Sequence, residues 1–308
     1  MLEINGESEK VNTVEPSLEL PPGAALFTIF LCMLFGANAV AIKISLAGIG
    51  VFTAAGLRFG CSAIIIFSWI RLTGRVMRID GCRVKKLVVA TMLFVVQVTL
   101  FYCGLKRTTA SHGVLIANLL PFVVLILAHF YIPGDGITGK KIIGVLLGFM
   151  GVLLLVFDKQ GISADIEIGD MIILGAVCVW GVSAVYVKTL TRTIHPVLIT
   201  FYPMIFATPV FLTAGFFLDR EMVVFIDGPV LFSMLYQSLV TASFGYIAWN
   251  TLIKKYGTTS VHSFIYIMPV SGVFFGVILL DEPVTPNIVG AIILIVIGIL
   301  VVNRKSGR

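Results

Sequence analysis

The sequence predicts an all-α polytopic membrane protein, with ten transmembrane helices arranged as two inverted five-helix repeats. Three observations lead to this fold class. Hydrophobic residues make up 58% of the 308 residues and charged residues only 12%, whereas a soluble domain carries about 25% charge. Apolar runs of roughly 20 residues, the length that a helix needs to cross a bilayer, recur along the chain. Short patterns in the first half also recur in the second half.

Charged residues, glycines and prolines divide the apolar sequence into ten runs of spanning length. The predicted spans are 23–44, 51–72, 86–105, 109–132, 138–157, 169–190, 196–218, 229–253, 258–280 and 285–302. The connections between them are short, so no soluble domain is inserted. The runs are also too long and too uniformly apolar for the short alternating strands of a membrane β-barrel.

Two pairs of matching segments indicate that the halves are homologous. Residues 35–43 read FGANAVAIK and residues 180–188 read WGVSAVYVK, so an aromatic residue opens each copy and a lysine closes it. Residues 104–121 (GLKRTTASHGVLIANLLP) align without gaps with residues 252–269 (LIKKYGTTSVHSFIYIMP). Each half then has five spans, and because five is odd, the second half enters the membrane inverted. Inverted repeats are typical of secondary transporters, which bind substrate near the midplane between the halves.

The predicted organisation has four parts. Residues 1–21 form a disordered cytosolic tail, residues 22–157 the first repeat with spans 1 to 5, residues 158–303 the second repeat with spans 6 to 10, and residues 304–308 a second cytosolic tail. The first tail is rich in glutamate. It has neither the positive start nor the short apolar core of a secretory signal.

Lysine and arginine gather on one side of the predicted membrane. The connections on that side contain Arg75, Arg78, Arg83, Lys85, Lys86, Lys140, Lys141, Arg192, Lys254 and Lys255, and the chain ends there with Arg304, Lys305 and Arg308. The basic side of a membrane protein is normally cytosolic. We therefore expect a multi-pass protein of the cell inner (cytoplasmic) membrane with both termini in the cytosol. The net charge of +6 is then a topology signal, and no nucleic-acid partner is expected.

Four short patterns together carry a resemblance to a known family. They are a small-residue stretch closed by a lysine, a triplet in span two, a Thr/Ser-rich lead to a proline in each half, and an acidic turn before the last span. In this sequence they are residues 36–43, Leu57-Arg58-Phe59, the leads to Pro121 and Pro269, and Asp281-Glu282-Pro283. The chain resembles the EamA-type branch of the drug/metabolite transporter superfamily from residue 23 to residue 302. The first half departs from the pattern, because Pro133-Gly134-Asp135 replaces the acidic turn.

The resemblance has consequences for function. It implies a carrier of small metabolites that often works outward, with spans one, three, four, six, eight and nine around a central cavity. The substrate does not follow from membership of the family. The two repeats of the sequence would then be two EamA units.

Polar side chains deep in an apolar span are costly, so they usually face a cavity or a partner. On this basis the predicted substrate-binding residues are Asn38, Gln97, Asn118, Trp180, Ser183, Tyr246, Trp249, Asn250 and Tyr266. In span eight, Ser243, Tyr246 and Asn250 share one α-helical face at spacings of three and four. The alternatives are contacts between helices made by small polar residues and, for Trp249, an interfacial aromatic belt.

Pro121 and Pro269 occupy aligned positions in spans four and nine. A proline frees a backbone carbonyl one turn back and kinks the helix, so both residues are predicted gating hinges. The alternative is a static kink that neighbouring helices satisfy.

Two cations lie closest to lipid. Lys43 lies near a span end, where it is expected to snorkel. Arg58 lies deeper and can pair with a carbonyl or a substrate anion. Span two is expected to be peripheral, which favours a structural role for Arg58. His112 also lies near a span end and is expected to be neutral and satisfied.

Some residue patterns are missing. No Asp or Glu lies well inside any predicted span, which disfavours a carboxylate proton relay. Walker, Gly-x-Ser-x-Gly, His-Glu-x-x-His and Cys-x-x-Cys patterns are absent, so we expect no enzyme activity, no cofactor and no metal.

The predicted function is that of a secondary transporter. Its cargo is a small polar or amphipathic metabolite, with amino acids and related compounds as the leading class and export as the direction. The expected partners are this small molecule and the lipid bilayer, and the chain is a monomer or a homodimer. The alternatives are a flippase for a lipid-linked substrate, a membrane-embedded enzyme, or a sensor or scaffold that transports nothing.

Overall fold

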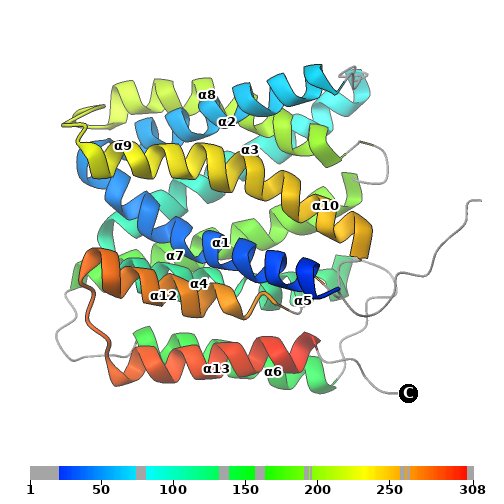
Figure 1. The fold of residues 1–308 in the computed structure, drawn as a ribbon, viewed down its shortest axis with the longest axis vertical. Helices are drawn as coiled ribbons and strands as arrows, with labels where there is room; N and C mark the ends of the chain where they lie inside the picture. The colour runs from blue at the N-terminus through cyan, green and yellow to red at the C-terminus, as the bar shows by residue number, and fades with distance from the viewer. Residues whose placement is uncertain are drawn as a thin grey trace, which may run out of the picture.

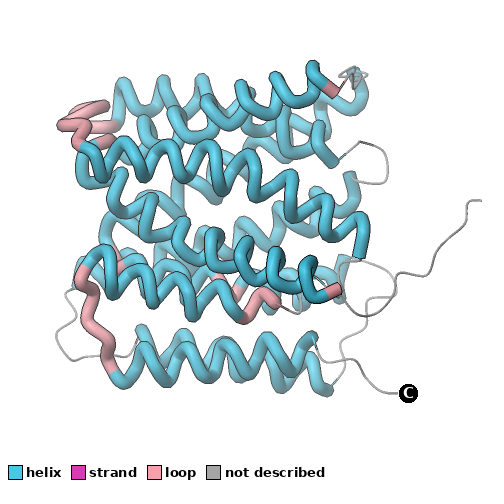
Figure 2. The backbone as a smooth tube through the Cα atoms, in the orientation of Figure 1, coloured by secondary structure: helices cyan, strands magenta, loops and turns pink. Residues whose placement is uncertain are grey.

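The structure is a computed structural model, which describes residues 21–73, 81–131, 139–156, 164–190, 194, 196–256, 261 and 264–303. Within these residues the chain is helical, apart from short connections and one isolated β-bridge between Ile49 and Val223. Figure 2 shows the helices lying roughly parallel to one another. Most of both predicted tails lies outside the described residues, as do Arg75, Arg78 and Arg192 of the basic connections and the turn at residues 133–135.

The helices follow one another in two series. The first half contains α1 (Pro22–Gly48), α2 (Val51–Leu72), α3 (Gly81–Arg107), α4 (Ala110–Ala117), α5 (Leu120–Tyr131) and α6 (Gly139–Val156). The second half contains α7 (Ala164–Leu190), α8 (Pro196–Leu218), α9 (Gly228–Leu235), the π-helix η1 (Tyr236–Gly245), α10 (Tyr246–Tyr256), α12 (Ile267–Leu280) and α13 (Pro286–Asn303). Each helix in the sequence thus begins or ends close to the charged, glycine or proline residues that divide the apolar runs.

Seven helical stretches of the described chain are long and apolar enough to cross a membrane. They are Pro22–Gly48, Val51–Leu72, Arg83–Arg107, Ala110–Leu127, Ala164–Leu190, Val197–Leu218 and Gly228–Trp249. Shorter apolar helices cover Ile142–Leu154, Ile267–Leu280 and Pro286–Val301. For the described residues, the prediction of an all-helical protein with several helices long and apolar enough to span a membrane is therefore confirmed.

Four pairs of helices share the most extensive contacts: α6 with α13, α3 with α7, α2 with α8, and α1 with α12. Figure 1 shows α6 and α13 side by side at one edge of the molecule. Glycine permits this close approach, because a Cβ atom on Gly298 of α13 would lie 2.7 Å from the carbonyl oxygen of Gly144 in α6. Small residues at such contacts are typical of helices packed within a membrane.

Two of the long stretches are irregular near their middle. The α4–α5 stretch breaks at Asn118 and Leu119, and Pro121, whose missing N–H cannot continue the α-helical bonding, is the second residue of α5. The stretch from α9 to α10 contains the ten-residue π-helix η1. Pro269 lies inside α12, just after a turn at residues 264–266. Helix irregularities of this kind are common at functional sites, and the first two border the cavity described next.

Candidate substrate cavity

A cavity of about 360 Å³ lies between the helices of the two halves. Its lining comes from α1, α2, α3, α4, α5, α7, η1, α10, α12 and the turns at residues 118–119 and 264–266. This volume lies near the lower end of the range of about 300–1,000 Å³ that is usual for small-molecule sites. The cavity therefore suits a compact metabolite.

Eight aromatic side chains line the cavity. They are Phe35, Phe59, Phe94, Phe101, Tyr102, Trp180, Tyr246 and Trp249. Two edge-to-face pairs fix part of this wall: the ring centroids of Phe35 and Trp249 lie 5.7 Å apart, and those of Phe59 and Phe94 lie 4.8 Å apart. Such pairs prefer this T-shaped geometry. The cavity thus offers broad, preformed apolar surfaces to its ligand.

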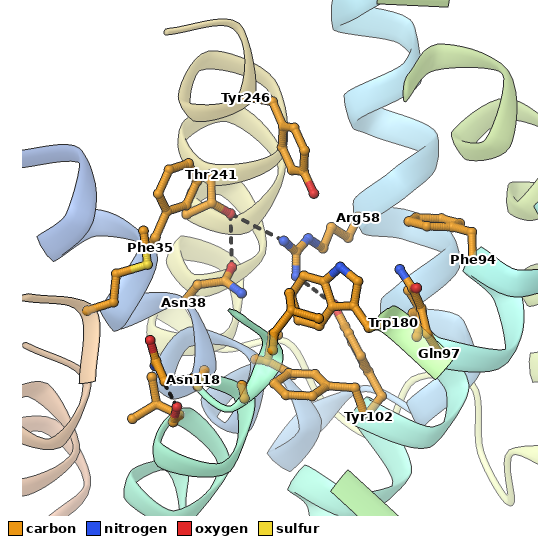
Figure 3. Close-up of a pocket in the computed structure, with 18 of the residues that line it drawn as sticks. Phe35, Asn38, Arg58, Phe94, Gln97, Tyr102, Asn118, Trp180, Thr241 and Tyr246 are labelled. Atoms are coloured by element: carbon orange, nitrogen blue, oxygen red, sulfur yellow. Dashed lines mark hydrogen bonds between the residues drawn. The ribbon is translucent and has the colours of Figure 1, made fainter. Parts of the chain in front are cut away.

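A polar network crosses the cavity from Arg58 to Asn38 (Figure 3). Arg58 donates through Nη1 to the Tyr102 hydroxyl at 3.2 Å and through Nη2 to Oγ1 of Thr241 at 3.4 Å. The Thr241 hydroxyl lies 2.9 Å both from Oδ1 of Asn38 and from the backbone oxygen of Gln237, and its single proton serves one of them at a time. The network joins α1, α2, α3 and η1 around one space.

Gln237 supports this network from behind the cavity wall. Its Oε1 accepts a hydrogen bond from the Tyr102 hydroxyl at 3.1 Å. Its Nε2 donates to the backbone oxygen of Ala41 and to Oγ of Ser45, both at 3.0 Å. Gln237 is fully buried, so its contacts fix the tyrosine ring and tie η1 to α1.

The π-helix decides which face of the eighth predicted span meets the cavity. Thr241 and Tyr246 both line the cavity although they are five residues apart, a spacing that places side chains on one face of a π-helix and on separated faces of an α-helix. Ser243 is instead buried and donates to the backbone oxygen of Ser238, five residues earlier, at 2.7 Å. The α-helical face predicted from the sequence, which included Ser243, is therefore wrong in its register.

The structure places the predicted site residues in three groups. The cavity lining includes Asn38, Gln97, Asn118, Pro121, Trp180, Tyr246 and Trp249. Ser183, Tyr266 and Pro269 lie outside the lining: Ser183 and Pro269 are buried, and Tyr266 packs against the main hydrophobic core. The side chain of Asn250 lies outside the described part of the structure.

Three polar lining residues were absent from the predicted binding set: Arg58, Tyr102 and Thr241. Span two was expected to be peripheral, which favoured a structural role for Arg58; the packing of α2 against η1 instead brings Arg58 to the cavity lining. Its depth in an apolar run was the available signal. Tyr102 lies five residues after Gln97, and no sequence pattern singled it out.

A cluster of charged and polar side chains lies next to the cavity, near the C-terminal end of α1. We call it the end cluster, and it consists of Lys43, Thr108, Ser111, His112, Asp170 and Glu282. Lys43 follows the lining residue Ile42 and donates through Nζ to the backbone oxygens of Leu105 and Thr108. Lys43 thus binds carbonyl groups at the end of α3, where the helix dipole favours a cation.

Two carboxylates complete the end cluster. Asp170 is 1% exposed; its Oδ2 lies 2.7 Å from Nδ1 of His112, and its Oδ1 accepts from Oγ1 of Thr108 at 2.5 Å. Glu282 accepts from the backbone N–H groups of Ala110 and Ser111, at the start of α4, and from Oγ of Ser111. The acidic turn noted in the sequence therefore caps a helix of the other half. Carboxylates are buried here although none lies at mid-span.

Comparison with known proteins identifies the family to which the chain belongs. The model of the EamA-like transporter family matches residues 23–157 and again residues 167–304. A solved structure described only as "Crystal structure of protein" shares the fold, with a TM-score of 0.67 and 18% identity over 91% of this chain and 96% of that chain.

Relatives of known name are transporters. An uncharacterised transporter of Bacillus subtilis (strain 168) is 25% identical over 92% of both chains. A probable amino-acid metabolite efflux pump of Escherichia coli (strain K12) is 27% identical, with 84% of this chain and 88% of the relative covered. An S-adenosylmethionine/S-adenosylhomocysteine transporter of Chlamydia trachomatis serovar L2 is 22% identical, with 92% of this chain and 90% of the relative covered. With a family match in each half, the chain belongs to the EamA-like transporter family.

Proposed function

We propose that the chain is a secondary transporter that moves a small polar or amphipathic metabolite across the cytoplasmic membrane by alternating access. The observation that carries this proposal is the cavity of about 360 Å³, which is lined by helices of both halves and has a polar network inside an aromatic wall. A site between two halves can be exposed to either side of a membrane when the halves rock against each other.

The proposal includes ten spans in two inverted repeats, residues 22–157 and 158–303. The helix packing supports this organisation. If each span of the first half corresponds to the span in the same position of the second half, every contact should have a counterpart with the halves exchanged. The counterpart of the α3–α7 contact is the contact of α1 with α9, η1 and α10, which is present. The counterpart of the α1–α12 contact is the contact of α7 with α4 and α5, which is also present. The pairs α6–α13 and α2–α8 are converted into themselves. This is the contact pattern that a two-fold relation between repeats produces.

The proposed orientation has both termini in the cytosol. In Figure 1, α1 begins and α13 ends at the same end of the molecule, as an even number of spans requires. The connections and the C-terminal tail assigned to that end together hold 13 of the 22 lysines and arginines of the sequence, and the positive-inside rule assigns such an end to the cytosol. The end cluster then lies toward the outside.

Amino acids and related compounds are the proposed cargo class, and export is the proposed direction. Two relatives support this choice by name: one is a probable amino-acid metabolite efflux pump, and the other transports S-adenosylmethionine, which contains an amino-acid group. Both kinds of cargo combine a polar group with a less polar body, as the lining of the cavity does.

Counterflow in proteoliposomes tests the proposal. Vesicles that hold the purified chain are loaded with one unlabelled amino acid at a time, and uptake of a trace of the same labelled compound is measured. We expect transient accumulation for at least one compound, and strong loss of it in Tyr246→Ala. The matched control is Phe232→Ala, since Phe232 lies in the same stretch but is 71% exposed and outside the lining. Translocation of a labelled lipid without counterflow of any soluble compound would favour the flippase alternative.

A further inference from the structure

Arg58 is a buried cation that has no carboxylate partner among the residues that the structure describes. The residue is 7% exposed, and its contacts within the described chain are neutral: the hydroxyls of Tyr102 and Thr241 and the ring face of Phe59 at 5.0 Å. Its Nε atom has no hydrogen-bond partner among the described residues. Among the described residues, the cavity lining contains no Asp or Glu.

An uncompensated charge inside a membrane protein is costly, and such residues usually mark a substrate pathway. The guanidinium group carries more N–H donors than its two hydroxyl contacts use. Its planar fork matches a carboxylate, to which it can donate two parallel hydrogen bonds. A bound anion would therefore supply the missing charge and accept from donors that the protein leaves without partners.

The surroundings of Arg58 define the rest of the ligand. Figure 3 shows Trp180, Phe94 and Tyr246 around the guanidinium group, with Gln97 on the same side as Phe94. The aromatic rings suit an apolar body. Gln97 lines the cavity, and its Oε1 has no partner among the described residues, so a small reorientation of this amide would let it accept from an N–H group of the ligand.

We propose that Arg58 anchors a carboxylate of the cargo, so that the substrates are small monocarboxylates with an apolar or aromatic body, including zwitterionic amino acids of that kind. This inference rests on the proposed transport function. It assigns the charge selectivity of the cavity to one side chain on α2. Removal of the cargo's negative charge should then weaken binding more than a change in its apolar body.

The test compares two molecules of nearly the same shape, 3-phenylpropanoate and its neutral amide 3-phenylpropanamide. Binding to the purified full chain in nanodiscs is measured through the fluorescence of tryptophan, because Trp180 and Trp249 both line the cavity. We expect the carboxylate to bind about tenfold more tightly or better, the factor that a charge-assisted hydrogen bond provides. Equal affinity for the two probes, or binding of neither, would overturn the proposal without any variant.

Variants then assign the preference to one residue. Arg58→Gln should remove the preference for the carboxylate over the amide, and Arg58→Lys should restore part of it. The matched control is Arg71→Gln, since Arg71 lies on the same helix but is exposed at its end. A preference that survives in Arg58→Gln would contradict the assignment. Counterflow of other solutes by a wild-type chain that binds neither probe would leave the transport function intact while rejecting this cargo class, whereas absence of all counterflow would reject the transport function itself.

Discussion

Nδ1 of His112 lies 2.7 Å from Oδ2 of Asp170, and the two side chains are 6% and 2% exposed. The contact joins α4 of the first half to α7 of the second half. Thr108 donates to the other carboxylate oxygen, so both oxygens of Asp170 have partners. A buried carboxylate that is satisfied in this way ties the halves together at the end of the cavity.

Loss of Asp170 should destabilise the protein strongly. Asp170→Ala leaves His112 and Thr108 buried without their partner, and removal of one member of a buried pair costs about 3–5 kcal/mol. The free energy of unfolding in mixed micelles measures this effect. The matched control is Asp165→Ala, which removes the exposed ion pair with Arg107 and should cost about 1 kcal/mol or less. An equal decrease in the free energy of unfolding in the two variants would show that the buried Asp170–His112 pair contributes no more to stability than the exposed ion pair.

Glu282 should keep the cavity closed at the end where the end cluster lies. Glu282→Ala removes the acceptor for the first N–H groups of α4, and we expect this to raise the population of states open at that end. The measurement is labelling of Val114→Cys, a cavity position, by an impermeant maleimide in a background without the native cysteines. The rate should rise several-fold.

The control for this experiment is Asp227→Ala. Asp227 caps α9 by accepting from the N–H of Val230 at 2.9 Å, and it lies outside the end cluster. Its loss removes a helix cap and should lower the stability of the protein by about 1 kcal/mol, without giving the maleimide more access to the cavity. Equal labelling rates in the Glu282 and Asp227 variants would contradict a closing role for Glu282.

Pro121 should act as a hinge. Pro121→Ala supplies the missing N–H and permits α4 and α5 to form one continuous helix, so we expect slower counterflow with an unchanged or higher melting temperature. Pro209→Ala is the control, because Pro209 lies inside α8 and outside the cavity lining. Counterflow at the wild-type rate in Pro121→Ala would instead support a static kink.

Gly298 should tolerate no side chain. A Cβ atom there would lie 2.7 Å from the backbone oxygen of Gly144, so Gly298→Ala must push α13 away from α6, at a cost of about 1–3 kcal/mol. Gly175→Ala is the control, since its Cβ would meet nothing within 4 Å and alanine favours a helix by about 1 kcal/mol. Thermal unfolding of the two variants should move in opposite directions.

The helical membrane fold followed from the sequence because bilayer thickness imposes a length on each apolar run. Seven stretches of the described chain meet that length. Several lining residues also followed, because Asn38, Gln97 and Asn118 are polar groups in apolar runs, which is a signal that a single sequence carries. These parts depend on local composition alone.

Other parts of the site depend on geometry that no local pattern records. The π-helix changes the angle between successive side chains. Thr241 therefore faces the cavity, where the α-helical spacing had predicted Ser243. Arg58 reached the site through the packing of α2 against η1. The pairing of Asp170 with His112 joins residues 58 positions apart, and only the folded chain shows that these two span ends meet.

The hydrogen bonds of Glu282 should constrain the evolution of position 282 more than that of its partners at positions 110 and 111. Its main partners are backbone N–H groups of residues 110 and 111, which nearly any side chain leaves in place. The carboxylate has no such substitute. Drift in related sequences should therefore be free at position 110, within the limits of its packing, and restricted at position 282, so that the two positions do not covary although they touch.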